Sequence, residues 1–580
     1  MSDSQVPVTP AQTAPALPAP VPPPRFLAVL ARRPYAVLAL LGLLLWLPGI
    51  LSLPPLDRDE SRFAQSSRQM VQSGDLVDIR FGQVPRYKKP AGIYWLQASS
   101  TALLGMGDDS RIWTYRVPSL LGAIAASWLT FWCAIAFAGS AAALLSGMLM
   151  LGTVLLTAEA TIATTDAVLQ ACIVAVMAVL LRVYRAARDP DAPSPSTRMV
   201  MAGWTALALG VLVKGPVAPA VALAAIIGLS AWDREIKWLG ALKPVRGFLL
   251  LLVLVMPWLV AITIQSNGAF FQQSLGDDFA AKLAGGQESH GAPPGYYLAL
   301  SAAAFFPSIL FVLPGVMQGI ARRADPAIRF LLVWAASWWI VVEIAPTKLP
   351  HYVLPAYPAL AILAALFVAA PQAVRGMTVA RWIAAIQYLA GALLLAAAPV
   401  LLPHLYGAGA TWWLMVLAAS GLVLALAALA LSVRRQMVPA VAAALLAMLV
   451  LVPTLTIGAA PRLAQLWVTE RLRPLVAVSS RPGDPPPALA GYQEPSMLFA
   501  LGKDVLLTDG KGAAEAGARA GGLALVEDQE LGGFLARLAE LQADAAPQAE
   551  VSGFNYSRGR KVHVTVFRVA RLQDPREPRR

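Results

Sequence analysis

Two aspartates stand next to strongly apolar stretches of the sequence. Asp59 lies in Leu-Asp-Arg-Asp-Glu-Ser-Arg-Phe, shortly after the apolar run 35–53, and Asp166 lies in Ala-Thr-Ile-Ala-Thr-Thr-Asp-Ala-Val-Leu. A carboxylate among apolar side chains is costly, so it needs a partner or a function. A carboxylate can orient or deprotonate an attacking hydroxyl group. Asp59 and Asp166 are therefore candidate catalytic acids.

Two lysines could neutralise an anion near these acids. Lys214 lies in Val-Leu-Val-Lys-Gly-Pro, and Lys348 lies in Ala-Pro-Thr-Lys-Leu-Pro-His-Tyr. A lysine at the end of an apolar helix either extends its ammonium group to water or binds an anion. Both interpretations stay open for Lys214 and Lys348 taken alone. The breaks in the backbone at Lys-Gly-Pro and Lys-Leu-Pro favour a shaped cavity.

A histidine and several aromatic residues give less specific indications. His290, in Gln-Glu-Ser-His-Gly-Ala-Pro-Pro, could bind a metal or an anion, or could be an ordinary surface residue. Tyr87, Tyr94, Trp95 and Tyr352 suit stacking against a sugar ring, and they equally suit the aromatic belt of a membrane protein.

The composition places most of the 580-residue chain in a lipid bilayer. Hydrophobic residues make up 57% and charged residues 14%, against about 25% charged residues in an ordinary soluble protein. A soluble enzyme, a disordered scaffold and a disulfide-rich secreted protein are excluded, and Cys133 and Cys172 in apolar stretches indicate neither a disulfide nor a zinc site. The net charge of +13 is concentrated in short loops, which is typical of membrane orientation and phosphate-rich partners rather than of nucleic-acid binding.

Long apolar runs alternate with short polar loops along most of the chain. Runs of about 17–25 mostly apolar residues predict about thirteen transmembrane helices, so the expected fold is a polytopic α-helical membrane protein. The runs lie near residues 35–53, 113–138, 140–158, 164–184, 200–214, 217–232, 246–265, 296–319, 328–345, 352–370, 382–402, 411–432 and 438–458.

The charges of the loops predict the orientation of the chain. Arginines gather in the loops that share a side with the N-terminus, whereas the opposite short loops carry only Lys214, Lys282 and Lys348. Positively charged loops stay in the cytoplasm, so the N-terminus is predicted to be cytoplasmic. With an odd number of spans, the C-terminus is predicted to lie outside, which in a bacterium is the periplasm.

This topology brings the candidate residues to one membrane face. Asp59, Asp166, Lys214 and Lys348 are all predicted to lie at the outer end of a span. Two carboxylates and several cations that converge there fit a site in which acids orient an acceptor in front of a phosphate.

Three segments do not follow the pattern of membrane-spanning runs. Residues 1–24 are rich in proline and predict a disordered cytoplasmic tail. Residues 54–112 form a long outer loop, in which 59–74 has the spacing of an amphipathic helix on the membrane surface. Residues 462–580 alternate short apolar runs with helical patterns, and they predict a small periplasmic α/β domain after a transmembrane domain over 25–461.

The polar segments resemble, in order, those of a known family of membrane glycosyltransferases. Arg-Asp-Glu-Ser-Arg-Phe-Ala at 58–64 resembles the first-loop signature of the ArnT-like lipid A aminoarabinose transferases, which stand with the protein O-mannosyltransferases among enzymes of the GT-C fold. The other matching segments are Arg-Gln-Met at 68–70, Ser-Gly-Asp at 73–75, Arg-Tyr-Lys-Lys-Pro at 86–90, Tyr-Trp at 94–95, Asp166, Lys-Gly-Pro at 214–216, His290 with Tyr-Tyr at 296–297, and Lys-Leu-Pro-His-Tyr-Val-Leu-Pro at 348–355. The ordered set over about 54–355 carries the resemblance.

The resemblance implies an inverting transfer of a sugar from a polyprenyl-phosphate carrier at the outer face of the inner membrane. The sugar would be aminoarabinose, a uronic acid or a hexose, and the acceptor would be lipid A, another part of the lipopolysaccharide, or a protein hydroxyl. Asp59 and Asp166 would be the acids of the catalytic site. The implied residues for the donor phosphate or the substrate are Arg62, Tyr87, Lys88, Lys89, Lys214, His290, Lys348 and Tyr352.

Lys88 departs from the family's pattern, because many relatives have Glu before Lys-Pro. In relatives that acid helps to hold a metal beside the loop histidine. No metal ligand set is therefore predicted here, and a divalent metal near His290 is the only cofactor to consider. An additional cation at this position fits a more anionic donor, such as a uronic acid sugar.

Other functions are compatible with part of the sequence. Within the resemblance, the alternative is an enzyme like the protein O-mannosyltransferases. A lipid or sugar transporter or flippase usually has repeated halves and charged residues near the membrane midplane, whereas no repeat is seen here and the polar residues gather at one face. A mere membrane anchor for the C-terminal domain gives no reason for Asp166.

Overall fold

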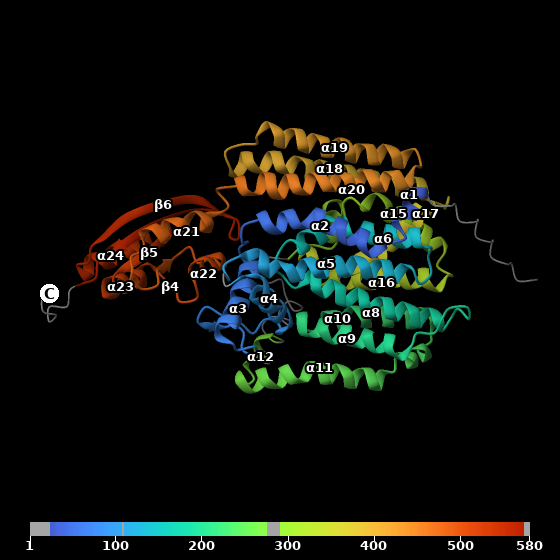
Figure 1. The fold of residues 1–580 in the computed structure, drawn as a ribbon, viewed down its shortest axis with the longest axis horizontal. Coiled ribbons are helices and arrows are strands. Elements are labelled where there is room, and N and C mark those ends of the chain that lie inside the picture. Colours follow the sequence, from blue (N-terminus) through green and yellow to red (C-terminus); the bar gives the residue numbers. More distant parts are fainter. Residues whose placement is uncertain (1–23, 107–108, 275, 277–290, 573–580) are drawn as a thin grey trace, which may run out of the picture.

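The structure, a computed structural model, describes residues 24–106, 109–274, 276 and 291–572. Helices from α1 (Arg25–Leu30) onward lie side by side in a bundle, and a smaller domain built on a β-sheet projects from one end of it (Figure 1). α1 lies at the opposite end of the bundle. Apart from Pro24, the tail predicted over 1–24 lies outside the described residues.

Among the described residues, ten helical segments are long and apolar enough to cross a membrane. They are α2 (Pro34–Ser52), α5 (Ile112–Ala134), α8 (Asp166–Ala186), α9 (Thr197–Lys214), α11 (Pro244–Gln265), α16 (Pro326–Ile344), η3 with α17 (Pro350–Ala369), α18 (Met377–Tyr406), α19 (Trp412–Val433), and α20 through η5 (Met437–Arg462). The helices α6 (Ser140–Leu151) and α7 (Val154–Ala160) add an apolar pair, and α10 (Val217–Asp233) and α15 (Ile309–Ala321) are shorter apolar helices.

Each of the thirteen predicted runs corresponds to one of these segments, but two of them are broken. The run 140–158 bends by 66° between α6 and α7. The run 296–319 is divided into α14 (Tyr296–Ala304) and α15, with Pro307 in the break, because proline cannot donate the backbone hydrogen bond that a continuous helix needs. The amide of Val154 donates to the carbonyl of Phe306 at 2.9 Å, so the two breaks face each other.

Close contacts between helices depend on small residues. A Cβ atom at Gly122 of α5 would lie 2.7 Å from the amide nitrogen of Val168 in α8, so these helices meet backbone against backbone. The outer helices differ, because only 22% of the apolar window of α11 and 28% of those of α18 and α19 are buried. These helices lie at the two edges of the bundle in Figure 1, and their apolar faces suit contact with lipid.

The loop predicted over 54–112 folds into two helices with a short hairpin between them. They are α3 (Asp59–Ser73), β1 (Arg80–Phe81), β2 (Val84–Pro85) and α4 (Gly92–Leu104). The helix predicted over 59–74 is present, and it ends at Gly74 in the left-handed conformation. Phe63 and Met70 are buried, whereas Val71 is 38% exposed. Figure 1 places α3 and α4 at the end of the bundle from which the sheet domain projects.

The C-terminal domain is a mixed five-stranded sheet with helices on both faces. The strand order is β4-β3-β5-β7-β6, in which β3 pairs in parallel with β4 and β5, and β7 pairs antiparallel with β5 and β6. The elements are α21 (Val468–Ser479), β3 (Ala488–Ala490), α22 (Pro495–Leu501), β4 (Leu506–Thr508), α23 (Gly510–Ala520), β5 (Gly522–Glu527), α24 (Asp528–Leu541), β6 (Ala545–Asn555) and β7 (Arg560–Val569). Every residue of the central strand β5 is buried, because helices cover both sides of it.

The C-terminal domain packs against the loop over 54–112. Phe499 of α22 is 2% exposed and lies edge-on to Tyr115, with ring centroids 5.7 Å apart. Arg68 of α3 donates to the carbonyl of Phe499 at 3.0 Å. The backbone amide of Asp57 donates to the Tyr556 hydroxyl at 2.7 Å. The domain is therefore held beside the start of α3, where Asp59 lies.

Candidate functional site

Asp166 and Lys214 meet at the ends of neighbouring helices. Asp166 is the first residue of α8 and Lys214 the last of α9, positions at which the helix dipoles favour a negative and a positive charge. The Lys214 ammonium donates to both Asp166 oxygens, at 2.7 and 2.8 Å. Their side chains are only 11% and 10% exposed. Gly215 ends α9 with a φ of 62°, which favours glycine at this turn.

A second acid and a histidine extend this ion pair. Glu159 of α7 has a side chain that is 8% exposed, and it accepts a hydrogen bond from the Thr164 hydroxyl at 2.8 Å. His351 lies in η3 (Pro350–Ala356), with Nδ1 3.7 Å from Glu159 Oε1 and Nε2 4.0 Å from Asp166 Oδ2. The imidazole therefore stands between two buried carboxylates.

An apolar cavity of about 670 Å³ adjoins this cluster. Its charged lining comes from Lys88, Lys89, Asp166, Lys214 and His351. Most of the remaining wall is apolar, and it includes Leu169, Val211, Leu259, Phe270, Phe271, Trp338, Val341, Val342 and Ile344. A cavity with an apolar wall and several cations fits a lipid that carries an anionic head group.

Five residues that were predicted from the sequence line the cavity, and one of them is Tyr352. Its ring centroid lies 5.9 Å from the Lys214 ammonium, within the range of a cation–π contact. Lys88, Lys89, Asp166 and Lys214 are the other four. These residues come from stretches far apart in the sequence. Of the four residues that the topology was predicted to bring together, Asp166 and Lys214 line the cavity, whereas Asp59 and Lys348 do not.

Four other predicted residues do not line the cavity. Asp59 is 63% exposed and has ion-pair contacts of 4.0 Å to Arg62 and 3.8 Å to Arg86. Tyr87 is buried, and its hydroxyl donates to Asp78 at 2.9 Å, while burial raises the pKa of Tyr87 to about 12. Lys348 is 5% exposed and donates to the carbonyl of Ala345 at 2.8 Å.

Asp59 is nevertheless connected to the same region, because Glu60, the next residue, accepts a hydrogen bond from the amide of Ala163 in the segment that leads to Asp166. Exposed at the start of α3, Asp59 is accessible to a molecule that approaches from outside the bundle.

A buried ion pair fixes the segment that carries Asp59. Arg116 of α5 donates to both Glu60 oxygens, at 2.7 and 2.9 Å, and to three carbonyls at the end of α2 and just beyond it, those of Ile50, Leu53 and Pro54. Glu60 also accepts from the amide of Ala163 at 2.8 Å. Glu60, which directly follows Asp59, is thus hydrogen-bonded to the segment that leads to Asp166.

The prediction for His290 cannot be compared with the structure, since His290 lies outside the described residues. Within 24–106, 109–274, 276 and 291–572, no three His, Cys, Asp or Glu side chains are grouped as they would be around a metal ion. The described acids near the cavity have Lys214 and His351 as partners.

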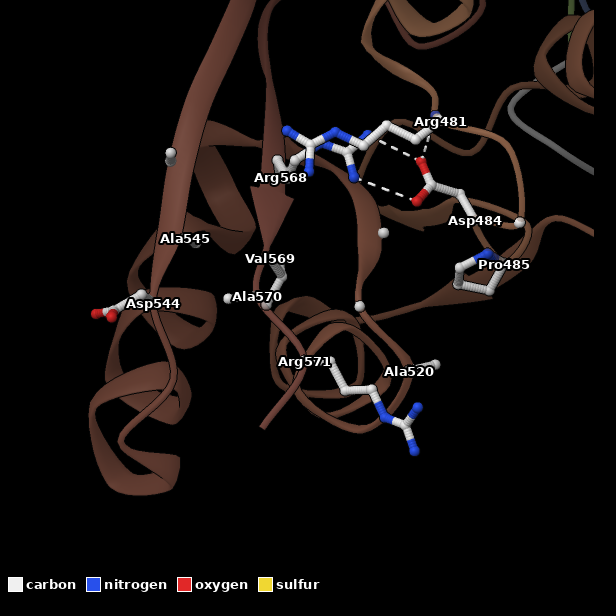
Figure 2. A pocket seen from close by; sticks show the side chains of 14 residues that line it. Arg481, Asp484, Pro485, Ala520, Asp544, Ala545, Arg568, Val569, Ala570 and Arg571 are labelled. Atoms are coloured by element: carbon white, nitrogen blue, oxygen red, sulfur yellow. Dashed lines mark hydrogen bonds and ion pairs between the residues drawn. The ribbon is translucent and has the colours of Figure 1, made fainter. Parts of the chain in front are cut away.

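A second hollow, of about 450 Å³, lies in the C-terminal domain (Figure 2). Arg568 donates to both oxygens of Asp484, at 3.2 and 2.8 Å, and its hydrogen bonds lower the pKa of Asp484. Figure 2 shows that Arg571 points away from this pair. The lining holds three arginines and two aspartates but no lysine, and Arg568 is paired with Asp484.

Several residues of the site were not identified from the sequence. Glu159 has the same signal as Asp166, an acid among apolar residues, but it lies just beyond the predicted end of the run 140–158. His351 stands in the Lys-Leu-Pro-His-Tyr segment that was recognised without being assigned a role. Arg116 carries a similar signal, a charge inside the predicted run 113–138, but it was not singled out, whereas Glu60 in a polar loop carried no local signal that could distinguish it from a solvated charge.

The chain is similar in sequence to known membrane glycosyltransferases. Residues 55–268 match the model of a family described as dolichyl-phosphate-mannose-protein mannosyltransferase. Two curated relatives are named undecaprenyl phosphate-alpha-4-amino-4-deoxy-L-arabinose arabinosyl transferase. The one from Erwinia tasmaniensis is 28% identical over 314 residues, 53% of this chain and 54% of the relative. The one from Yersinia pestis is 27% identical over 335 residues, 57% and 58% of the two chains. The match therefore spans little more than half of either relative.

Two crystal structures of ArnT from Cupriavidus metallidurans match nearly the whole chain. The structure bound to undecaprenyl phosphate has a TM-score of 0.72 at 20% identity, and covers 93% of this chain and 97% of that one. The chain has the ArnT fold. The apo state of that protein has a TM-score of 0.70 with the same coverage. The ArnT-like fold confirms the prediction of a polytopic GT-C membrane protein with a small C-terminal α/β domain.

Proposed function

We propose that this chain is an inverting glycosyltransferase that moves a sugar from polyprenyl phosphate to lipid A or another part of the lipopolysaccharide. The observation that carries the proposal is the apolar cavity of about 670 Å³ with Lys88, Lys89 and the Asp166–Lys214 pair in its wall. The undecaprenyl phosphate in the ArnT structure of the same fold and the names of the curated relatives support this donor class.

The lysines act on the leaving group. As the bond between the anomeric carbon and the phosphate oxygen breaks, negative charge grows on the polyprenyl phosphate. Lys89 and Lys214 stabilise that charge from the cavity wall, so the leaving group requires no general acid. Lys88 adds a cation that suits a donor sugar with a carboxylate. An unchanged donor preference in Lys88→Glu would contradict this role of Lys88.

Asp59 acts on the acceptor. Its exposed carboxylate orients an acceptor hydroxyl and takes the proton as the acceptor oxygen attacks the anomeric carbon on the side opposite the phosphate. With a phosphate acceptor, which is already ionised at neutral pH, Asp59 only orients the reactants. Asp166 holds Lys214 beside the cavity and balances its charge.

The proposed orientation puts the N-terminus in the cytoplasm, and the site and the C-terminal domain in the periplasm at the bacterial inner membrane. The arginine-rich loops on one side support it. The positions of α1 and the C-terminal domain at opposite ends of the bundle also agree with it (Figure 1).

The test is transfer of a labelled sugar from polyprenyl phosphate to lipopolysaccharide in membranes that contain the full chain. We expect wild type to transfer the label and Asp59→Asn to be slower by about 10²–10⁴-fold, the usual contribution of a positioned acid or base. Asp191→Asn, in an exposed loop at the other end of α8, is the matched control and should keep the wild-type rate. Equal rates in wild type and Asp59→Asn would refute the role of Asp59. Label on periplasmic protein instead of lipopolysaccharide would replace the acceptor with a protein hydroxyl.

A further inference from the structure

If the proposed function is correct, the Lys214 ammonium interacts with two anions, the Asp166 carboxylate and the donor phosphate. Its ammonium donates to both oxygens of Asp166, and the same ammonium lines the cavity in which the donor phosphate would bind. A phosphate on Lys214 therefore brings a second anion next to a carboxylate whose side chain is 10% exposed. Lys88 and Lys89 also face the phosphate from the cavity wall, but Asp166 then shares the Lys214 ammonium with the phosphate, and a second cation beside Asp166 lowers the repulsion between the two anions.

His351 is placed to supply that cation. Its Nε2 lies 4.0 Å from Asp166 Oδ2, about 1 Å beyond the usual hydrogen-bonding distance. It stands on η3, a different element from those that carry Asp166 and Lys214, so a small turn of its ring changes its distance to Asp166 without moving Lys214. His351 also lines the cavity.

Glu159 gives the protonated imidazole a second partner. It lies 3.7 Å from Nδ1, on the side of the ring away from Asp166, and its carboxylate is buried with a hydroxyl donor from Thr164. Among the residues that the structure describes, Glu159 from α7 and Asp166 from α8 face the two ring nitrogens, and Tyr352 of η3 packs edge-on against the imidazole. Lys214 from α9 is paired with the same Asp166. Asp166 then has two cationic partners, Lys214 and the protonated imidazole, when the Lys214 ammonium is shared with a phosphate.

We propose that His351, held by Glu159, is a positioning residue that pairs with Asp166 when Lys214 binds the donor phosphate. The inference rests on the proposed function. It assigns to His351 and Glu159 a role in donor binding that acts through Asp166 and Lys214, without direct contact between His351 and the phosphate.

The experiment measures binding of undecaprenyl phosphate, without a sugar, to the full chain in nanodiscs. We expect His351→Gln to weaken binding about tenfold or more, as for the loss of a hydrogen bond between charged groups, and Glu159→Gln to weaken it less. The double variant His351→Gln/Glu159→Gln should be no weaker than His351→Gln alone, because Glu159 acts through His351. His404→Gln, an exposed histidine of α18 outside the cavity, should bind like wild type.

A suppressor variant separates positioning from direct contact with the phosphate. In Asp166→Asn the like-charge repulsion is gone, so His351→Gln/Asp166→Asn should recover the affinity of Asp166→Asn. This recovery also shows that the His351→Gln substitution does not by itself prevent folding of the site.

Binding as weak in this double variant as in His351→Gln would overturn the proposal, and so would unchanged binding in His351→Gln. Failure of wild type to bind undecaprenyl phosphate would instead refute the proposed function, so the two failures are distinguishable.

Discussion

Replacement of Glu60 by Gln tests how the segments that carry Asp59 and Asp166 are held together. Glu60 accepts four hydrogen bonds, from the amides of Leu56 and Ala163 and from two nitrogens of Arg116. The side chains of Glu60 and Arg116 are 1% and 0% exposed. In Glu60→Gln the amide NH₂ group faces these donors, and the guanidinium of Arg116 loses its counter-charge.

The structure allows the size of the effect to be estimated. Removal of one partner of a buried ion pair costs about 3–5 kcal/mol, which lowers the ratio of folded to unfolded protein by at least about 10²-fold. The segments before Asp166 and around Asp59 also lose their common anchor, and a displacement of about 1 Å between reacting groups can cost about 10²-fold in rate. We therefore expect Glu60→Gln to have a lower melting temperature and a far lower rate of sugar transfer.

Melting temperature in detergent and sugar transfer in membranes measure the two effects. Glu515→Gln is the matched control, because Glu515 pairs with Arg537 while their side chains are 43% and 33% exposed, and exposed ion pairs contribute little. Equal melting temperatures for Glu60→Gln and Glu515→Gln would refute the reasoning. A destabilised Glu60→Gln that transfers sugar at the wild-type rate would show that this ion pair does not position the acids.

Two further predictions concern the neighbouring segments. Burial raises the pKa of Asp57 from 3.8 to about 6, so the contribution of Asp57 to stability is complete below about pH 4 and is lost as the pH rises through about 6. The melting temperature of wild type should fall through this range more than that of Asp57→Asn, and parallel curves of melting temperature against pH would contradict the raised pKa. In Gly122→Ala the new Cβ would lie 2.7 Å from the backbone of Val168, so we expect the free energy of unfolding to fall by about 1–3 kcal/mol and sugar transfer to be slower because the start of α8 moves. The control Gly139→Ala, whose Cβ meets nothing within 4 Å, should have the melting temperature of wild type.

The membrane-spanning segments could be predicted because their signal is local. Each run of about 20 apolar residues indicates a helix wherever it occurs, since lipid cannot satisfy an open backbone. The bend between α6 and α7 was not predicted, because both halves are equally apolar and the bend of 66° is set by contacts such as that of Val154 with Phe306.

The site was predictable only in part, for a related reason. Asp166 and Lys214 were identified because each is a charge in an apolar context, and the structure brings them to 2.7 Å. Tyr87 was predicted to contact substrate, and that role stays a prediction; the structure places Tyr87 in a buried contact with Asp78. An aromatic residue in a polar loop has no local feature that distinguishes stacking on a sugar from packing in a core.

The sequence by itself determined the solvent, the places of the apolar segments and which charges stand at the ends of helices, because these depend on short stretches of side chains and their transfer energies. The number of spans was not determined in this way, since about thirteen were predicted and ten helical segments among the described residues are long and apolar enough to cross a membrane. Only the tertiary structure decided that His351 stands between Glu159 and Asp166, that Glu60 and Arg116 are buried together, and that the lysines share one cavity. These relations depend on how helices distant in the chain approach each other, and that approach is set by close packing at residues such as Gly122, which no local pattern of hydrophobicity encodes.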